Sequence, residues 1–368
     1  MQIVSTGKAH RIYTSPICIS NLLDPKVYSI VFNEREGFAL VDSDNILITE
    51  KIYGIHEEKV NKVLNSFGLF DRNLGVILSG DKGIGKSLFA KRLSQRAIEN
   101  NYPVIIVDQF LPGIGDFISS IKQECLILFD EFDKTFCNGS HRNEMSDPQT
   151  GLLTLFDGLA QGKKLFVVTC NNLTGLNEFL INRPGRFHYH FRFEYPTGEE
   201  VNDYLKDKIP ESMYSEIPKV VNFSQKVRIN YDCLRAIAFE LALGNKFENA
   251  IRDLNIMNIQ KETHICTVHF TDGTKSDSRE TNLDLFSYEP ELIEFTWSGL
   301  DFYTEFTPSE IAYNPSLGIS SAEGKIIDFE ESYNNHNGKE PLFQELRQKE
   351  IAYISFRRKL APNLHYSL

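Results

Sequence analysis

The chain has 368 residues, of which 41% are hydrophobic and 24% charged, and this predicts two or three globular domains with apolar cores. Its net charge of −11 argues against non-specific binding to nucleic acid, which needs clustered Lys and Arg. The six cysteines form no C-x-x-C pair and no metal-like spacing, which favours a reducing compartment. Because no apolar run is long enough to cross a membrane and no signal-peptide pattern is present, we expect a cytoplasmic protein without membrane contact.

The first part of the chain contains short β-like runs such as "VYSIVF" and "GFALV", separated by Asp, Asn and Pro. This pattern predicts a small β-rich N-terminal region over residues 1–46.

Strand-like and helix-like segments alternate from about residue 47 to residue 196. The strand-like runs "GVILS", "PVIIVD", "CLILFD" and "LFVVTC" are almost continuously apolar, as expected for strands covered on both faces. The alternation therefore predicts an α/β fold with a doubly wound parallel sheet. Cys125 and Cys170 fall in these runs and are expected to be buried thiols.

A glycine-rich turn, "VILSGDKGIGKS", follows the first of these strands and opens a helix. It fits the P-loop pattern G-x-x-x-x-G-K-[ST], whose backbone N–H groups face phosphate oxygens. We expect Lys86 to reach the β- and γ-phosphates of ATP and Ser87 to ligate Mg²⁺. The predicted nucleotide-binding residues of this turn are Gly80, Lys82, Gly83, Ile84, Gly85, Lys86, Ser87 and Leu88.

Adjacent acids end the strand "CLILFDEFDK". Asp130 is placed to hold Mg²⁺, and Glu131 can act as general base towards the attacking water. The alternative is a solvated acidic turn after a buried strand. Asn171 ends the strand "LFVVTCNN", between the P-loop strand and the acidic strand, where it could bind the attacking water or the γ-phosphate; Asn172 is the competing candidate.

Two arginines, Arg183 and Arg186, flank Pro-Gly in "INRPGRFHYHF". A guanidinium can fork onto phosphate oxygens, and an arginine supplied in trans can accelerate hydrolysis. On its own, the pattern is more typical of two surface arginines near a turn.

The remaining chain predicts two further domains. Residues 197–260 are mostly helical: Thr197 and Glu200 form a capping signal, and "YDCLRAIAFELAL" has helical spacing and ends at Gly244. Residues 261–368 predict an α+β domain of unknown role, with strands in "THICTVHF" and "ELIEFTWSGLDFYTEF", a packed Trp297, a loop over 331–340 and a final helix over 342–360.

The motifs, taken in order, resemble those of the AAA+ ATPases, in particular the AAA group with a second region of homology. The matching strings are "KIYGIHEEK", the P-loop, "ILFDEFD", "QTGLLTLFDG", "VVTCNN" and "NRPGRF". The chain is similar to the ATPase modules of AAA proteases and Bcs-type translocases, and in layout to compact phage-encoded AAA ATPases. The resemblance covers residues 47 to about 200, and less well to 258.

The resemblance implies a role for each matching residue. Tyr53 and Gly54 match the segment that meets adenine, Lys86 and Ser87 Walker A, Asp130 and Glu131 Walker B, and Asn171 sensor 1. Arg183 and Arg186 match the arginine fingers, which act on the neighbouring subunit's nucleotide and so imply a homo-oligomeric ring, usually a hexamer. Arg235 could be a sensor 2 that contacts the γ-phosphate, or a helix-surface arginine. In ring translocases an aromatic residue at the position of Phe110 faces the pore and could grip a protein client; the alternative is a core Phe.

Three departures from the family pattern stand beside the resemblance. The string before the arginines is unusual, with its acid at Glu178; the helical lid has "INYDCLRAI"; and neither a transmembrane anchor nor an H-E-x-x-H motif is present.

The expected function is that of a chaperone-like hexameric ATP hydrolase that remodels, unfolds or disassembles a protein. The alternatives are a nucleic-acid-associated AAA+ protein, such as a helicase loader, clamp loader or packaging accessory, and an ATP-dependent assembly switch.

Overall fold

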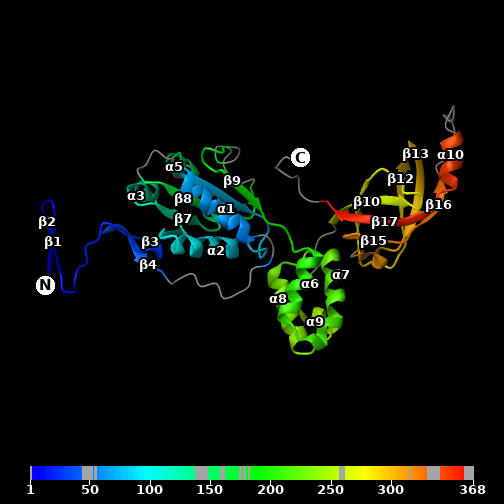
Figure 1. The fold of residues 1–368 in the computed structure, drawn as a ribbon, viewed down its shortest axis with the longest axis horizontal. Coiled ribbons are helices and arrows are strands. Elements are labelled where there is room, and N and C mark those ends of the chain that lie inside the picture. Colours follow the sequence, from blue (N-terminus) through cyan, green and yellow to red (C-terminus); the bar gives the residue numbers. More distant parts are fainter. Residues whose placement is uncertain are drawn as a thin grey trace. The chain divides into compact units, whose positions relative to one another are not determined.

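The computed structural model describes residues 2–43, 53, 56–136, 148–157, 162–173, 176, 180, 183–256, 262–314, 316–329 and 340–359. Two of the predicted positions, Gly54 and Glu178, and almost all of the predicted loop over 331–340 lie outside these residues. The chain divides into two compact units, residues 1–194 and 195–368, each of which is described by itself (Figure 1).

A seven-stranded sheet forms the centre of the first unit, in the order β4-β3-β6-β7-β8-β5-β9. Every neighbouring pair is parallel except β3 and β4, so the predicted α/β fold is confirmed. The strands are β3 (Val27–Asn33), β4 (Gly37–Asp42), β5 (Leu74–Ser79), β6 (Val104–Val107), β7 (Cys125–Phe129), β8 (Lys164–Cys170) and β9 (Tyr189–Arg192).

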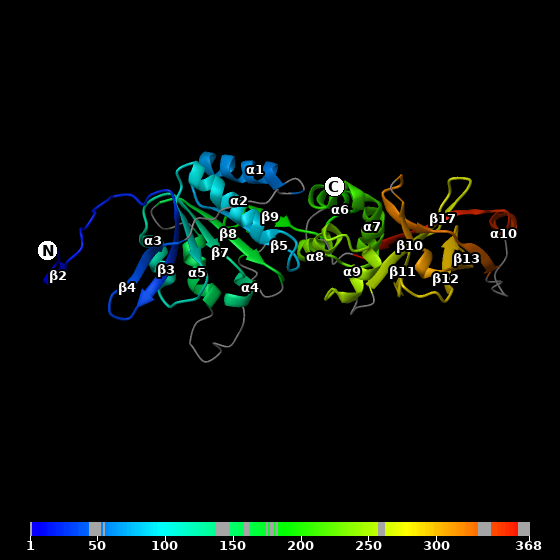
Figure 2. The ribbon, with the colours of Figure 1, turned by 90° about the horizontal axis from the view of Figure 1, so that it is seen from below.

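Helices cover both faces of this sheet (Figure 2), which is why every residue of β5, β7 and β8 is buried. Ile77, Phe129 and Phe156 belong to one large cluster of buried apolar side chains, the main apolar cluster of this unit. α1 and α2 lie on one face, and α3, α4 and α5 on the other. The helices are α1 (His56–Leu69), α2 (Lys86–Glu99), α3 (Ile114–Ser120), α4 (Phe132–Thr135) and α5 (Pro148–Phe156).

The β-like runs of the N-terminal region are strands, but they do not form one separate piece. Among the described strands, β1 (Gln2–Thr6) and β2 (Ala9–Tyr13) pair only with each other. β3 pairs in parallel with β6, Val27 opposite Val104, because β6 would otherwise leave one edge of its backbone without a partner strand. Residues 27–42 therefore extend the central sheet.

The second unit begins with a helical bundle. Thr197 and Glu200 form the predicted capping box at the start of α6. α8 ends next to Gly244, which has φ 88°, as predicted for a helix C-terminus. The helices are α6 (Gly198–Lys208), the 3-10 helix η2 (Glu211–Glu216), α7 (Ile217–Lys226), α8 (Tyr231–Ala242) and α9 (Phe247–Asp253).

Two sheets follow the bundle, in the orders β11-β10-β17-β15-β14 and β12-β13-β16. Their apolar residues form one cluster, in which Trp297 is 7% exposed and packed as expected. The elements are β10 (Glu262–Phe270), β11 (Arg279–Leu283), β12 (Glu291–Trp297), β13 (Leu300–Phe306), η3 (Pro308–Glu310), β14 (Ala312–Asn314), β15 (Ile319–Ala322), β16 (Lys325–Phe329), α10 (Glu340–Arg347) and β17 (Ile351–Arg358).

The bundle and the two sheets pack together. The ammonium of Lys226, the last residue of α7, donates to the carbonyl of Ser309 at 2.6 Å, and the side-chain oxygen of Asn222 accepts from the backbone N–H of Tyr313 at 2.8 Å. The segments 197–260 and 261–368, expected as two domains, thus form one compact unit.

The final helix predicted over 342–360 is wrong. α10 ends at Arg347, and β17 runs from Ile351 to Arg358 between β10 and β15. Residues 351–356 alternate side chains between two faces, and pairing with two strands satisfies both edges of the backbone. This tertiary pairing outweighs the local helical spacing.

Candidate nucleotide site

Three strands of the central sheet end together at one edge. β8 lies between β5 and β7; Ser79 of β5 is paired with Cys170, and Phe129 of β7 with Val168. The next residues along these strands are Gly80, Asp130 and Asn171. The predicted phosphate-binding, acidic and amide groups therefore meet at the carboxyl edge of the parallel sheet, where α/β proteins bind ligands.

The P-loop turn has the backbone that a phosphate cradle requires. Gly80, Gly83 and Gly85 have φ values of 141°, 73° and 102°. A Cβ on Gly80 would lie 2.4 Å from Cδ1 of Ile84 and 2.5 Å from the carbonyl of Phe193, so only glycine fits there. Gly85 is the N-cap of α2 and has no side chain to occupy the first-turn N–H groups, which can face an anion.

The Lys86 side chain connects the P-loop to β8. Its ammonium donates to the carbonyls of Gly80 and Asp81, both at 2.6 Å, and to Oδ1 of Asn171 at 3.0 Å. Burial lowers the pKa of Lys86, while nearby groups, Asp130 and Asp133 among them, act in the opposite direction. Two residues that lie 85 positions apart in the sequence thus share one hydrogen bond.

This contact distinguishes the two asparagine candidates. Asn171 turns its side-chain oxygen towards Lys86, whereas Asn172 is exposed. The backbone N–H groups of both residues donate to Oδ2 of Asp133, at 3.0 and 3.4 Å.

The acidic turn after β7 is held in an unusual conformation. Glu131 has φ 49°, in the left-handed region that costs a non-glycine residue free energy. Its backbone N–H donates to Oγ1 of Thr169 at 2.8 Å, and the same hydroxyl donates to Oδ1 of Asp130 at 2.6 Å. The carboxylate of Glu131 is half exposed and forms an ion pair with Lys134.

Sequence reasoning missed Thr169 and Asp133, which tie the acidic turn to the end of β8. Thr169 is 1% exposed, and one Oδ1 atom of Asp133 is buried without a hydrogen bond among the described residues. The available signals were a hydroxyl in the otherwise apolar run "LFVVTC" and a third acid in "DEFDK".

The two candidate arginines lie in different surroundings. Arg186 is 8% exposed, and its guanidinium forms a two-pronged ion pair with Asp157, Nη2 to Oδ2 at 2.7 Å. The Arg186 guanidinium holds the pKa of the Asp157 carboxyl below its usual range. Arg183, in contrast, is exposed. Their turn packs closely on β5, the strand before the P-loop. A Cβ on Gly75 of β5 would lie 2.3 Å from the carbonyl oxygen of Arg186.

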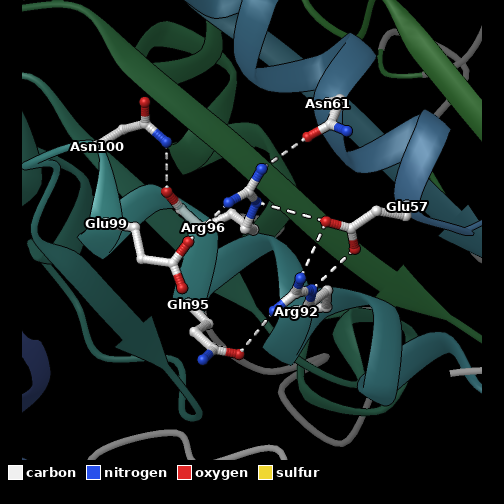
Figure 3. A network of polar contacts seen from close by, with 7 residues as sticks. All are labelled: Glu57, Asn61, Arg92, Gln95, Arg96, Glu99 and Asn100. Carbon is white, nitrogen blue, oxygen red and sulfur yellow. Dashed lines mark hydrogen bonds and ion pairs between the residues drawn. The ribbon is translucent and has the colours of Figure 1, made fainter. Parts of the chain in front are cut away.

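A network of charged groups joins α1 to the P-loop helix α2 (Figure 3). Glu57 accepts from Nε and Nη2 of Arg92, at 2.8 and 2.9 Å, and lies 3.5 Å from Nε of Arg96. Arg96 also donates to Asn61 at 3.2 Å and to Glu99 at 2.8 Å. The Arg92 guanidinium lowers the pKa of Glu57. Glu57 lies four residues after Tyr53, the predicted adenine contact, which is half-buried.

The two remaining predicted residues have the following surroundings. Arg235 belongs to the second unit, on α8, where it is exposed and lies 3.7 Å from Asp232. Phe110 is half-buried and packs edge-on against Phe136, with ring centroids 5.9 Å apart, as part of the covering of the main apolar cluster. Its surroundings are those of the core phenylalanine that the sequence left open as the alternative.

The residues at the edge fit a magnesium–nucleotide complex. Ser87 is exposed at the start of α2, Asp130 is oriented by Thr169, and hydroxyl and carboxylate oxygens suit Mg²⁺. Over the described part of the chain, no cluster of three or more His, Cys, Asp or Glu side chains forms a further metal site, and no helix is both long and apolar enough to span a membrane.

Comparison with known proteins gives one family. Residues 76–195 match the model of the ATPase family associated with various cellular activities (AAA). The chain is 26% identical over 213 residues to a putative ribosome biogenesis ATPase of Dictyostelium discoideum, covering 51% of this chain and 24% of that protein. It is 28% identical over 238 residues to the uncharacterized AAA domain-containing protein ycf46 of Trieres chinensis, covering 57% and 47%.

A third relative is an ATP-dependent zinc metalloprotease, FtsH 1, of Phytoplasma mali, 32% identical over 128 residues, with 31% of this chain and 21% of the relative covered. The aligned part thus spans less than half the length of each of these three relatives.

Proposed function

Because residues 76–195 of this chain are a domain of the AAA ATPase family, we propose that the chain hydrolyses ATP as part of an oligomeric ring and uses the energy to remodel a protein substrate. The observation that carries the proposal is the meeting of Lys86, Asn171, Asp130 and Glu131 at one sheet edge.

Nucleotide binding would use the P-loop backbone. The N–H groups of the turn and of the first turn of α2 bind the phosphates, and Lys86 exchanges its bonds to the Gly80 and Asp81 carbonyls for phosphate oxygens. Ser87 and Asp130 would hold Mg²⁺, which neutralises charge on the phosphates when bound.

Hydrolysis would use the two side chains beyond the phosphates. Glu131 takes a proton from a water molecule whose oxygen forms a bond to the γ-phosphorus, while the bond to the bridging oxygen of ADP breaks. Asn171 orients this water or the γ-phosphate.

Of the two arginines, Arg183 is the better candidate for acting on a neighbouring subunit's nucleotide. It is exposed, whereas the two-pronged bond to Asp157 holds Arg186 inside its own subunit. We assign Arg186 to positioning the turn that carries Arg183.

The remodelling of a protein client is supported by the names of several relatives. They include ribosome biogenesis ATPases, a peroxisomal ATPase and ATP-dependent zinc metalloproteases. For Phe110 to grip a client, its ring would have to leave the contact with Phe136. The net charge of −11 favours a protein over a nucleic acid as the substrate.

The first experiment compares Glu131→Gln and Lys86→Ala with the wild type in ATP hydrolysis and in the binding of a fluorescent ATP analogue. We expect Glu131→Gln to bind the nucleotide normally and to hydrolyse ATP at least about 100-fold more slowly. Lys86→Ala should lose binding. Near-normal turnover of Glu131→Gln would refute the general-base role, and tight binding by Lys86→Ala would refute the phosphate site.

A further inference from the structure

The second unit contains a cavity of about 500 Å³ at one end of its five-stranded sheet. The strand register explains which side chains face it. His264 of β10 lies opposite Arg358 of β17, and Phe356 of β17 lies opposite Ser320 of β15. Opposed residues, and residues two apart on one strand, share a face of a sheet, so these four side chains belong to the same face.

The cavity exists because the side chains that would fill this corner are missing or small. Gly318, two residues before Ser320, has φ 65°, and a Cβ built there would meet no atom within 4 Å. Leu317 and Gly318 are exposed, so the rim of the cavity reaches solvent. Its walls are apolar and buried: Leu285, Ile311 and Phe356.

Basic side chains lie at one end of the cavity. His264 is only 3% exposed, and Arg358 is half-buried. Nη2 of Arg358 donates to the carbonyl of Gln225 at 2.9 Å and lies 3.4 Å from that of Ser224, both in the last turn of α7. These bonds fix the guanidinium beside the cavity. Arg357 also lines it, and no Asp or Glu is among the described lining residues.

We propose that this cavity binds a small organic carboxylate, with the carboxylate at Arg358 and His264 and an apolar body against Leu285, Ile311 and Phe356. The planar fork of an arginine matches a carboxylate, and the volume lies within the range of small-molecule sites. The apolar walls favour such a ligand over inorganic phosphate, which has no apolar part to bury.

A ligand in this cavity would touch both parts of the second unit. Gln225 belongs to the helical bundle, whereas the other lining residues belong to the sheets and their connections. Occupation would therefore stabilise the packing of α7 on the sheets. The proposal does not depend on ATP hydrolysis, because every lining residue lies outside residues 76–195.

The test is titration calorimetry of the full chain with octanoate, and in parallel with octan-1-ol and inorganic phosphate. We expect octanoate to bind at millimolar concentration or below, and the two other compounds to bind at least about tenfold more weakly, as expected for loss of a charge-assisted hydrogen bond or of the apolar contacts. Arg358→Gln and the cavity-filling Ser320→Leu should each weaken octanoate binding at least about tenfold. Arg279→Gln, on the exposed part of β11, is the matched control and should bind as the wild type does.

Octanoate binding that is absent from the wild type, or unchanged in both cavity variants, would overturn the proposal. So would octan-1-ol or phosphate binding as tightly as octanoate. If loss of the hydrogen bonds between Arg358 and α7 prevents Arg358→Gln from folding, octanoate binding by Ser320→Leu tests the proposal instead, because Ser320 does not form these hydrogen bonds.

Discussion

At the scale of single residues, the most informative side chain is Thr169. One hydroxyl accepts from the Glu131 backbone and donates to Asp130, so it sets the positions of two groups that the proposed reaction uses. The left-handed φ of Glu131 persists because this bond helps to hold it. Thr169 is a positioning residue, since it acts through the two acids.

Replacing Thr169 with Val removes the hydroxyl and keeps the shape of the side chain. We expect kcat for ATP hydrolysis to fall about tenfold or more, because two hydrogen bonds of about 1 kcal/mol each are lost. Nucleotide binding should stay within about twofold, because the P-loop is untouched. Thr169→Ser, which keeps the hydroxyl, is the control and should retain most of the activity. Equal losses in Thr169→Val and Thr169→Ser would argue against the positioning role.

At the scale of elements, α1 and α2 are joined by the Glu57 network (Figure 3). α2 carries the predicted phosphate-binding turn at its start, and α1 follows the segment that contains Tyr53. Glu57 therefore links the helix after the predicted adenine contact to the helix after the predicted phosphate-binding turn. Its ion pairs are partly exposed, which limits their contribution.

Substitution of Glu57 by Gln should raise the KM for ATP about two- to fivefold and leave kcat unchanged, because the pair orients bound nucleotide without taking part in the reaction. The charge exchange Glu57→Arg with Arg92→Glu should restore part of the affinity. Glu99→Gln, which removes only an outer partner of Arg96, is the matched control. A lower kcat at normal KM in Glu57→Gln would contradict this assignment.

Lys349 lies in the connection between α10 and β17, and its side chain is 3% exposed. It joins α10 to the turn that follows β10. Its ammonium forms an ion pair with Asp272, lies 3.3 Å from Glu345 and stands 4.3 Å from the ring centroid of Trp297. The bonds from Lys349 and Thr274 lower the pKa of Asp272 from 3.8 to about 2.

The lowered pKa of Asp272 predicts a defined pH dependence. A carboxyl whose pKa is lower in the folded chain stabilises it fully above the unfolded value, and that stability is lost as pH falls through the folded value. Asp272→Asn should therefore melt at a lower temperature than the wild type above about pH 4, and the difference should shrink below that pH and vanish once pH falls below about 2. Thermal melts of both proteins across this range test it; a difference that does not change with pH would contradict the ion-pair origin.

At the scale of the whole molecule, the proposed function needs more than one copy of the chain. Arg183, the proposed trans arginine, is exposed, whereas Arg186 is bound to Asp157. A trans arginine requires that subunits assemble.

Assembly predicts complementation between two inactive variants. Arg183→Ala should bind ATP and lose about 10³-fold in hydrolysis, and mixing it with Glu131→Gln should restore part of the activity. The mass of Glu131→Gln, measured by sedimentation, should rise to that of a ring on addition of Mg-ATP. A strict monomer with ATP bound, or no recovery in mixtures, would favour an ATP-dependent switch over a ring. Arg186→Ala should lower thermal stability as well, because it leaves Asp157 without its guanidinium.

The sequence by itself determined the parts of this protein that depend on local pattern. Continuous apolar runs that alternate with helix-like segments are typical of strands covered on both faces, so the α/β sheet was predictable, and so were the capping box at Thr197 and the buried Cys125 and Cys170. The glycines before Lys86 have positive φ angles that few other residues adopt, so the P-loop turn can be recognised from the sequence.

Only the tertiary structure decided what depends on contacts between distant segments. The pairing of Arg186 with Asp157, the two hydrogen bonds of Thr169 to the acidic turn and the contact of Lys86 with Asn171 all join residues far apart in the chain. β17 was misread as a helix for the same reason: its strand partners, β10 and β15, are remote in sequence. Local spacing carries no information about such partners, and their hydrogen bonds and burial outweigh intrinsic propensity.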